Sequence, residues 1–252
     1  MRRSIYRKIY RHASSLARRL LDLSGLVAFR KSSNLYLPEE NLCQVLVSLI
    51  DTTTPTVIDG GSHHGDMVEK FSRLLPDSRF ICFEPNSSLA DLLMSRYRNN
   101  NCVTIVQSAL GETSGSTTFN INSSEATSSI LDTSANLDSQ LAELCHQVKQ
   151  IEVPIVSIDE YCRTNGITSV DVLKLDLQGY DYLALKGARD TIKNVRCILV
   201  ELMFSDIYKG SASFDEIFAL MKEFGLKLFT LGAMKYSDNS QLLWCDAIFV
   251  RS

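Results

Sequence analysis

The chain has 252 residues, of which 45% are hydrophobic and 22% charged, a composition typical of one ordinary globular α/β domain. Its net charge of −3 hides an asymmetry. Residues 1–31 hold nine Lys/Arg and one acid, a charge of +8, whereas residues 32–252 hold 17 against 28, a charge of −11. A nucleic-acid partner is therefore not expected for the acidic body of the chain.

The cysteines and the hydropathy pattern indicate a reducing compartment and no membrane-spanning segment. The seven cysteines include no C-x-x-C pair and several lie within apolar runs, which is typical of reduced, mostly buried thiols. No run of 18 or more apolar residues occurs, so no membrane-spanning helix is expected. We therefore expect a cytoplasmic protein, with any membrane contact peripheral and made through residues 1–31.

Residues 1–31 form a separate basic arm, and residues 32–252 the main domain. Apolar residues recur in the arm at helical spacing beside a stripe of arginines, which predicts an amphipathic basic helix. Such a helix can lie on an anionic membrane surface or pack against the domain or a partner. Its Arg-rich, acid-poor sequence also resembles an organelle transit peptide.

After a predicted helix at 39–50, residues 56–86 predict a nucleotide-type cofactor site. A strand at 56–60 carries Asp59 and runs into a Gly60-Gly61 turn, and Gly65 closes the loop before a helix at 66–75. A second strand at 79–84 ends on Glu84. The carboxyl ends of adjacent parallel strands meet in one crevice, where glycines admit a ligand and Glu84 can accept both hydroxyls of a ribose.

The loop spacing separates the possible cofactors. No register of the glycines satisfies the dinucleotide fingerprint G-x-G-x-x-G, because Ser62 or His63 occupies a required position. The spacing D-x-G-x-x-x-G instead fits the first motif of S-adenosylmethionine enzymes. A tight strand-to-helix turn without a ligand is the alternative, and a dehydrogenase is a third possibility.

The following segments continue the alternation of strands and helices. A helix at 87–98 and a strand at 103–107 complete a βαβαβ unit, which predicts a doubly wound parallel sheet. A hairpin strand is expected at 117–121. Residues 122–150 form an insertion, a polar loop followed by a helix whose apolar positions are Leu137, Leu141, Leu144 and Val148. Such an insertion is either a substrate lid or a solvated surface loop.

The strand at 170–176 is the second informative site. Alternation places Lys174 and Asp176 on one face, with Asp176 at the carboxyl end where ligands bind. Before it we expect a strand at 151–156 and a short helix capped by Ser157 and Glu160. After it we expect a helix reaching about residue 194, a strand at 197–202 with Glu201, a helix at 213–224, and strands at 227–231 and 245–250.

With both sites in view, the chain resembles the FkbM-type methyltransferases, a branch of the class I S-adenosylmethionine enzymes, over roughly residues 55–250. VIDGGSHHGD resembles the first motif of that family, FEPN the ribose-binding second, and QSALGETSG the third, which lies by the adenine. SSILD resembles its insertion loop, VSIDEYC the start of a helix, and VDVLKLDLQGYDYLALKGA its fourth motif.

The resemblance implies a class I methyltransferase fold, a doubly wound, Rossmann-like, mostly parallel seven-stranded sheet with an antiparallel last strand. It also implies methyl transfer from S-adenosylmethionine to an oxygen, often of a sugar or polyketide. Two residues depart from the family pattern. His63 replaces the usual Asn and keeps the hydrogen-bonding capacity. Gln178 replaces the usual Glu and removes an anion beside Asp176, which argues against metal ligation or proton transfer at position 178.

These patterns predict an O-methyltransferase acting on a hydroxyl of a sugar, glycan or polyketide-like small molecule. Asp176 is the candidate base, with Lys174 beside it to lower its pKa or steady an oxyanion. Asp176 can alternatively orient the cofactor, and Lys174 can be a structural charge. No metal-ligand spacing occurs, so no structural metal is expected; a loosely bound Mg²⁺ at Asp176 is the alternative, without a carboxylate at position 178. The predicted cofactor-binding residues are Asp59, Gly61, His63, Gly65, Glu84, Pro85, Ser108 and Ala109.

A second hypothesis from another class remains open at this point. The chain could be a catalytically weakened binding protein with the methyltransferase fold, docked to a membrane or a partner through its basic arm. The intact Asp59, Gly61, Gly65 and Glu84 argue against it, because a site without turnover has no need of a ribose acceptor. The acceptor and the oligomeric state are not specified by the sequence.

Overall fold

The computed structural model describes residues 39–251. The predicted basic arm at 1–31 lies outside these residues. Within the described part of the chain, every helix is too short or too polar to cross a bilayer.

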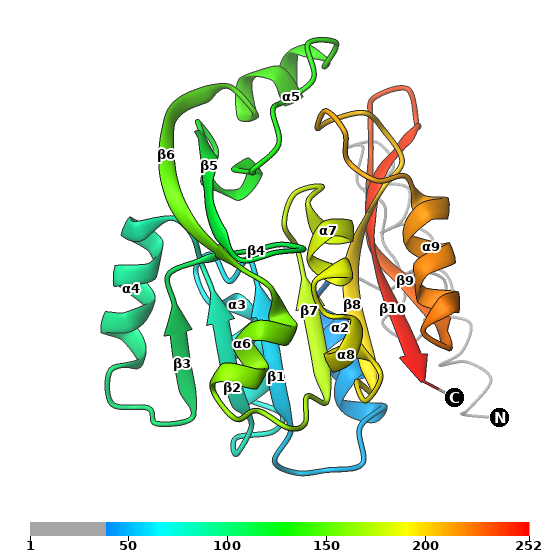
Figure 1. Cartoon of the computed structure of the whole chain (residues 1–252). Coiled ribbons are helices and arrows are strands. Elements are labelled where there is room, and N and C mark those ends of the chain that lie inside the picture. The colour runs from blue at the N-terminus through cyan, green and yellow to red at the C-terminus, as the bar shows by residue number, and fades with distance from the viewer. Residues whose placement is uncertain (1–38, 252) are drawn as a thin grey trace, which may run out of the picture. The chain divides into compact units, whose positions relative to one another are not determined.

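A seven-stranded sheet organises the domain, and its strands run in the order β3-β2-β1-β7-β8-β10-β9 (Figure 1). Five of them are parallel neighbours, whereas β10 lies between β8 and β9 and is antiparallel to both. This confirms the predicted mostly parallel sheet with an antiparallel last strand. The strands are β1 (Thr56–Gly60), β2 (Arg79–Phe83), β3 (Val103–Val106), β7 (Val172–Leu175), β8 (Cys197–Met203), β9 (Leu226–Tyr236) and β10 (Leu242–Arg251).

Helices connect the parallel strands as the alternating pattern predicts. Before the insertion the helices are α2 (Glu39–Ser48), which precedes β1, and α3 (Asp66–Ser72) and α4 (Ser87–Tyr97), which follow β1 and β2. After the insertion follow α6 (Ile158–Thr164), α7 (Asp181–Lys186), α8 (Arg189–Ile192) and α9 (Phe214–Glu223). Ser157 caps α6 by accepting the backbone N–H of Glu160, which is one half of the predicted capping box; the backbone N–H of Ser157 donates to Ser114 Oγ and not to Glu160. Ser213 with Glu216 forms a complete capping box on α9.

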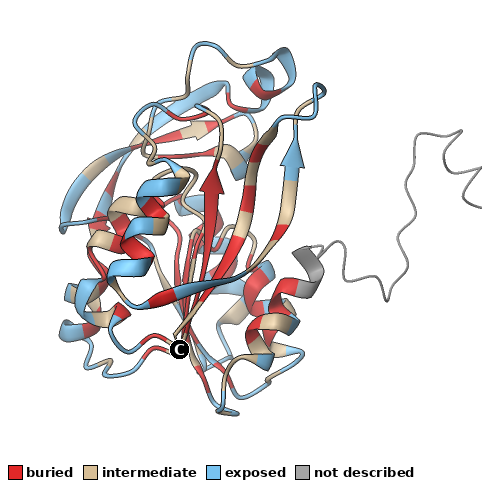
Figure 2. Ribbon diagram, turned by 90° about the vertical axis from the view of Figure 1, so that its right-hand side faces the viewer, coloured by how far each residue is buried: buried red, intermediate tan, exposed pale blue. Residues whose placement is uncertain are grey.

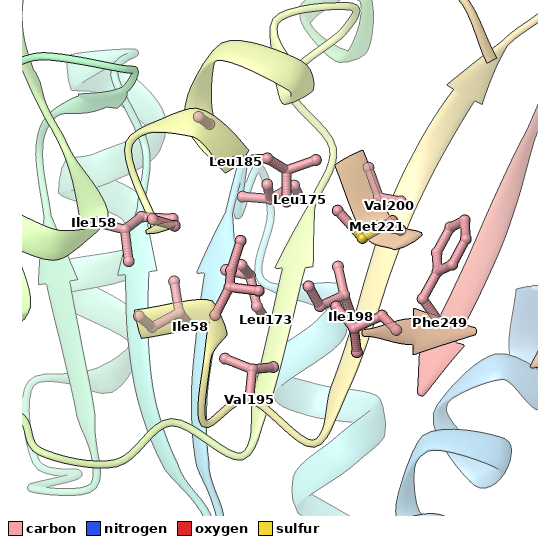
Figure 3. Close-up of a cluster of buried hydrophobic side chains, with 14 of the residues drawn as sticks. Ile58, Ile158, Leu173, Leu175, Leu185, Val195, Ile198, Val200, Met221 and Phe249 are labelled. Atoms are coloured by element: carbon pink, nitrogen blue, oxygen red, sulfur yellow. The ribbon is translucent and has the colours of Figure 1, made fainter. Parts of the chain in front are cut away.

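The main core lies against one face of the sheet, where branched side chains of β1, β7 and β8 meet α6 to α9 (Figure 3). Leu173, Leu175, Ile198 and Val200 are at most 1% exposed. Because strand side chains alternate, Asp59 and Lys174 face the opposite side, toward α2 and α3. Burial runs along the strands, while the outer surfaces of the helices are exposed (Figure 2). Each fully buried Leu or Ile stabilises the fold by about 1.5–3 kcal/mol.

Residues 109–156 form a second, three-stranded sheet. The sequence predicted strands at 117–121 and 151–156 but not their pairing into a separate sheet. Its order is β4-β6-β5, from β4 (Ala109–Leu110), β6 (Gln147–Val156) and β5 (Gly115–Asn122). The predicted helix through Val148 is wrong: α5 covers only Ser139–Leu144, and Val148 lies exposed on β6. Its apolar spacing fits a helix, but the pairing of eight β6 residues with β5 outweighs that local preference.

Two further boundaries differ from the predictions. The single helix expected up to residue 194 is split at Gly187, whose added Cβ would lie 2.0 Å from the carbonyl oxygen of Gly111. This close backbone approach requires glycine there. The last two strands also extend well beyond the predicted ranges and pair as a long antiparallel hairpin.

Candidate functional site

The glycine loop after β1 is held in a conformation that few other residues could adopt. Gly61 has φ +72° and an added Cβ would lie 2.1 Å from the carbonyl oxygen of Asp176. Gly65 has φ +82° and caps α3, where a Cβ would lie 2.9 Å from Leu93. The backbone N–H groups of Gly61 and Ser62 both donate to the Phe83 carbonyl, at 3.0 and 3.1 Å. The loop is therefore fixed against the end of β2, as the sequence predicted.

Glu84, directly after β2, is 4% exposed and lines a cavity beside this loop. Its Oε2 accepts the backbone N–H of His63 at 2.8 Å, and its Oε1 accepts that of Asn86 at 2.9 Å. Burial raises the pKa of Glu84, and the two backbone hydrogen bonds oppose that rise. A carboxylate offers about four lone-pair sites, so each oxygen keeps one for a ligand hydroxyl.

The cavity spans the carboxyl ends of β1, β2, β3 and β7 and encloses about 730 Å³ including its mouth. Among the predicted residues, Gly61, His63, Glu84, Pro85, Ser108, Ala109 and Asp176 all line it. Leu89, Leu110 and Phe119 add apolar wall beside Pro85 and Ala109. One end is thus suited to a flat apolar ring, the middle to a hydroxylated group, and the Asp176 end to a polar group.

Asp59 lies beneath the site and is not among the side chains that line the cavity. It is fully buried, and neither of its oxygens makes a hydrogen bond of normal geometry within the described residues. Its charge is balanced by the ammonium of Lys174, its register neighbour on β7, at 3.1 Å from Oδ1. The sequence identified the motif position, but only the fold shows that this carboxylate faces Lys174.

Lys174 supports the loop from below. Its Nζ donates to the carbonyls of Gly61 at 2.8 Å and Gly60 at 3.2 Å, and lies 3.8 Å from Oδ2 of Asp176. Burial alone would lower the pKa of Lys174, but the carboxylates of Asp59 and Asp176 raise it above its usual value. The lysine therefore stays charged and joins the glycine loop to Asp176.

Asp176 stands where two cavities meet. Its side chain is 42% exposed, and it lines the first cavity together with a second one formed beside α2 and α3. The two cavities share Gly61, His63 and Asp176. Gln178 donates to Oδ1 of Asp176 at 2.8 Å, while Lys174 lies near Oδ2. The carboxylate is thus oriented from both sides and open to two ligand spaces.

Buried acids surround this end of the site, and one of them was not predicted. Glu201 on β8 is 6% exposed, and burial, followed by the charges of Asp176, Asp181 and Asp246, raises its pKa well above the usual value. Asp181, at the start of α7, was missed by the sequence analysis. Burial, and then Asp176, raises its pKa to about 7. Its position within the DLQGYD run was the available signal.

The two loop histidines differ in their surroundings. His63 lines both cavities with φ +47°, and burial, then His64, lowers its pKa. His64 lies 3.9 Å from Glu125 of the short 3-10 helix η1 (Glu125–Thr127). Among the described residues, His63, His64 and Glu125 form the one group of three potential metal ligands, their ligand atoms within 4.8 Å of one another. Their spacing in the sequence, two adjacent histidines and an acid about 60 residues later, gives no signal of this grouping.

The insertion lies over the carboxyl ends of the strands, with β5, β6 and α5 at the top of the view in Figure 1. Its residues Glu125, Ala126, Ser128 and Ile130 line the first cavity. The insertion therefore borders this cavity, and the choice between a substrate lid and a surface loop stays a prediction. Within it, the cavity-lining residues lie in and just after η1, ahead of α5.

Strand order, glycine loop and carboxylate define the class of protein. A parallel sheet whose first strand leads into a glycine loop, whose second ends on an acid, and whose last strand is inserted antiparallel is a class I methyltransferase fold. The cavity lies at the carboxyl edge of the sheet, on the two sides of β1 where the chain order reverses, the usual ligand position of such folds.

Comparison with known proteins identifies the family. A family model described as the methyltransferase FkbM domain matches residues 59–228, more than half of the chain. The 2-O-methyltransferase NoeI of Sinorhizobium fredii is 23% identical over 186 residues, covering 72% of this chain and 76% of that protein. The crystal structure of methyltransferase FkbM from Methylobacillus flagellatus matches with a TM-score of 0.52 and 13% identity, covering 85% of this chain and 48% of that one.

The chain therefore belongs to the FkbM methyltransferase family, and it is an S-adenosylmethionine-dependent methyltransferase. It spans about half the length of the Methylobacillus protein. The residues present fit the cofactor. Glu84 keeps free lone pairs for ribose hydroxyls, apolar side chains line the end expected for adenine, and Gly61 leaves backbone accessible in the loop.

Proposed function

We propose that this protein methylates a hydroxyl group of a sugar, a glycan or a polyketide-like small molecule. The observation that carries the proposal is the carboxylate of Asp176, half-exposed at the junction of two cavities and oriented by Gln178 and Lys174. The similarity to NoeI, named a 2-O-methyltransferase, supports transfer to oxygen.

The first cavity is the proposed cofactor site. Glu84 would hold the ribose hydroxyls, Pro85, Ser108 and Ala109 would flank the adenine, and the Gly61–Gly65 loop would hold the amino-acid tail. When bound, S-adenosylmethionine supplies an electrophilic methyl group on its sulfonium. Asp59 and Lys174 would act indirectly, by keeping the loop carbonyls in place.

Asp176 is the proposed base. The acceptor hydroxyl would approach through the second cavity and donate its hydrogen bond to a carboxylate oxygen of Asp176. Methyl transfer would break the carbon–sulfur bond of the sulfonium, leave S-adenosylhomocysteine and form the new carbon–oxygen bond. The hydroxyl proton would pass to the Asp176 oxygen and later to solvent, which Asp176 reaches through its exposed side. Holding the hydroxyl in line supplies about 7–11 kcal/mol, and a positioned base adds roughly 100- to 10,000-fold in rate.

Methyl transfer from labelled S-adenosylmethionine, screened over glycans, lipid-linked sugars and polyketide alcohols, tests the proposal. The wild-type enzyme should transfer the labelled methyl group to a hydroxyl oxygen and form a methyl ether. Asp176→Asn should lower kcat by roughly 100- to 10,000-fold while S-adenosylhomocysteine binding changes little. Labelling of an amine or a thiol, or full activity of the Asp176→Asn variant, would overturn it. Asp91→Asn, an exposed acid on α4, is the matched control.

A further inference from the structure

Gln178 lies between two carboxylates and uses every polar atom of its side chain. Its Nε2 donates to Oδ1 of Asp176 at 2.8 Å and to Oε2 of Glu201 at 3.2 Å. Its Oε1 accepts the hydroxyl of Tyr208 at 2.6 Å. An amide offers two N–H donors on one side and a carbonyl on the other. Rotating it by half a turn would point the carbonyl at both acids, so one orientation is fixed.

The same residue is bonded to the insertion. Ser129 donates its hydroxyl to the backbone carbonyl of Gln178 at 2.8 Å. Tyr208, 2% exposed, also lies 3.0 Å from the Thr127 carbonyl, so its hydroxyl stands between the insertion and Gln178. Gln178 has φ +53°, a region that residues with side chains rarely adopt. These bonds hold it there, and they link the insertion to the end of β7.

A carboxylate at position 178 could not replace these contacts without taking up a proton. An ionised carboxylate has no N–H to donate, and it would place a third acid within hydrogen-bond distance of Asp176 and Glu201. The charged and titratable groups around the position come from five parts of the chain: Asp176 and Lys174 at the end of β7, Asp181 on α7, Glu201 and Tyr208 on and after β8, Asp246 on β10, and Cys145 after α5.

We propose that Gln178 is a positioning residue, a neutral double donor that orients the acceptor-facing carboxylate of Asp176 and fastens the insertion to the same point. The proposal rests on the proposed role of Asp176. Gln178 acts through that carboxylate and not on the reacting atoms.

Two cofactor analogues of known structure test this without an identified acceptor. S-Adenosylhomocysteine lacks the methyl group, whereas sinefungin carries an amine-bearing carbon in the place of the methylsulfonium. The ratio of their Kd values, measured by calorimetry from pH 6 to pH 8.5, reports whether a carboxylate faces the methyl position. Wild type should prefer sinefungin, and Asp176→Asn should remove most of that preference.

The variants at position 178 carry the decisive result. Gln178→Ala should lower the preference at every pH. Gln178→Glu should keep most of it at pH 6, where a protonated Glu can donate its single O–H to Asp176, and lose it about tenfold by pH 8.5 relative to wild type. Tyr208→Phe, which frees the amide to flip, should cause a partial loss. The matched control Gln241→Glu, an exposed residue in the β9–β10 turn, should follow wild type.

The outcomes separate the two proposals. If Asp176→Asn leaves the ratio unchanged, Asp176 does not face the methyl position and the proposed base is wrong. If Asp176→Asn removes the preference while both Gln178 variants keep it at every pH, the base stands and the positioning role is wrong. Unchanged S-adenosylhomocysteine affinity and circular dichroism confirm that each variant is folded. Should Gln178→Ala fail to fold, Gln178→Glu and Tyr208→Phe decide the question.

Discussion

The carboxylates at the two ends of the site, Glu84 and Asp176, are held by different kinds of donor. At the cofactor end, both oxygens of Glu84 accept backbone N–H groups, and the glycine loop is fixed by backbone bonds to Phe83. At the proposed acceptor end, Asp176 is oriented by two side chains, Gln178 and Lys174. Backbone donors are independent of side-chain identity, whereas side-chain donors can be exchanged by single substitutions.

This difference teaches where specificity can change. Substitutions around Glu84 keep its donors as long as the loop keeps its shape, so this end suits a cofactor shared by a whole family. At the proposed acceptor end, one substitution at position 178 alters the charge next to Asp176.

Gly61→Ala should have the largest effect. The new Cβ would lie 2.1 Å from the Asp176 carbonyl oxygen at φ +72°, so loop and β7 must separate. We expect a loss of roughly 3–5 kcal/mol in the free energy of unfolding and no measurable S-adenosylhomocysteine binding. Denaturant unfolding and calorimetry measure both. Gly210→Ala is the control, because its φ of +76° is similar but nothing lies within 4 Å of the added Cβ.

Glu84→Ala should come next, and it tests the cofactor end alone. The change removes the acceptor proposed for two ribose hydroxyls and leaves the N–H groups of His63 and Asn86 without their partner. We expect S-adenosylhomocysteine affinity to fall at least about 100-fold, or roughly 3 kcal/mol. Unaltered affinity in calorimetry would contradict the cofactor assignment. Glu143→Ala, an exposed acid on α5, should bind as wild type does.

The sequence predicted the elements around Glu84 better than the contacts around Asp176, because the former depend on local backbone conformation and the latter on side chains distant in the sequence. β1 to β3 and the Gly61–Gly65 loop were placed within one residue, because glycines and an acid at strand ends encode a local backbone conformation. The network of Gln178 with Tyr208 joins residues 30 positions apart, and that with Ser129 joins residues 49 apart. Such distances carry no periodic signal, so only the folded chain shows these contacts.

Misplaced elements also have tertiary causes. Val148 fits a helical stripe but lies on β6, since pairing with β5 continues past the predicted strand start. The split at Gly187 reflects the approach of Gly111, a contact between distant segments. Asp59 was placed in the cofactor motif by its spacing, yet its side-chain direction follows from strand alternation against Lys174.

Asp181→Asn should raise the free energy of unfolding at high pH, because a buried acid near Asp176 destabilises the fold when it ionises. Its pKa is raised from 3.8 to about 7, so the folded state keeps a proton that the unfolded state loses in that window. Stability therefore falls as pH rises from about 4 to 7. Asn retains an oxygen for the Leu177 N–H and cannot ionise. The variant should exceed wild type in urea stability by about 1–4 kcal/mol at pH 8 and by less at pH 5.

One result would contradict the prediction for Asp181. If Asp181→Asn and wild type lose stability equally between pH 5 and pH 8, Asp181 is ionised in the fold throughout and does not contribute to the pH dependence. Asp215→Asn, at an exposed position in the first turn of α9, provides the reference slope for removing an acid that is not buried.

Ser129→Ala should give the smallest effect and tests the bond between the insertion and Gln178. The hydroxyl donates to the Gln178 carbonyl at 2.8 Å and accepts the Leu131 N–H at 3.1 Å. Its loss should cost about 1 kcal/mol, and amide hydrogen exchange across residues 122–135 should quicken several-fold, while β1 to β3 stay unchanged. Equal exchange rates in Ser129→Ala and in the exposed control Ser139→Ala would mean that other contacts hold the insertion. The hydrogen bond from Ser129 would then not couple the insertion to Gln178.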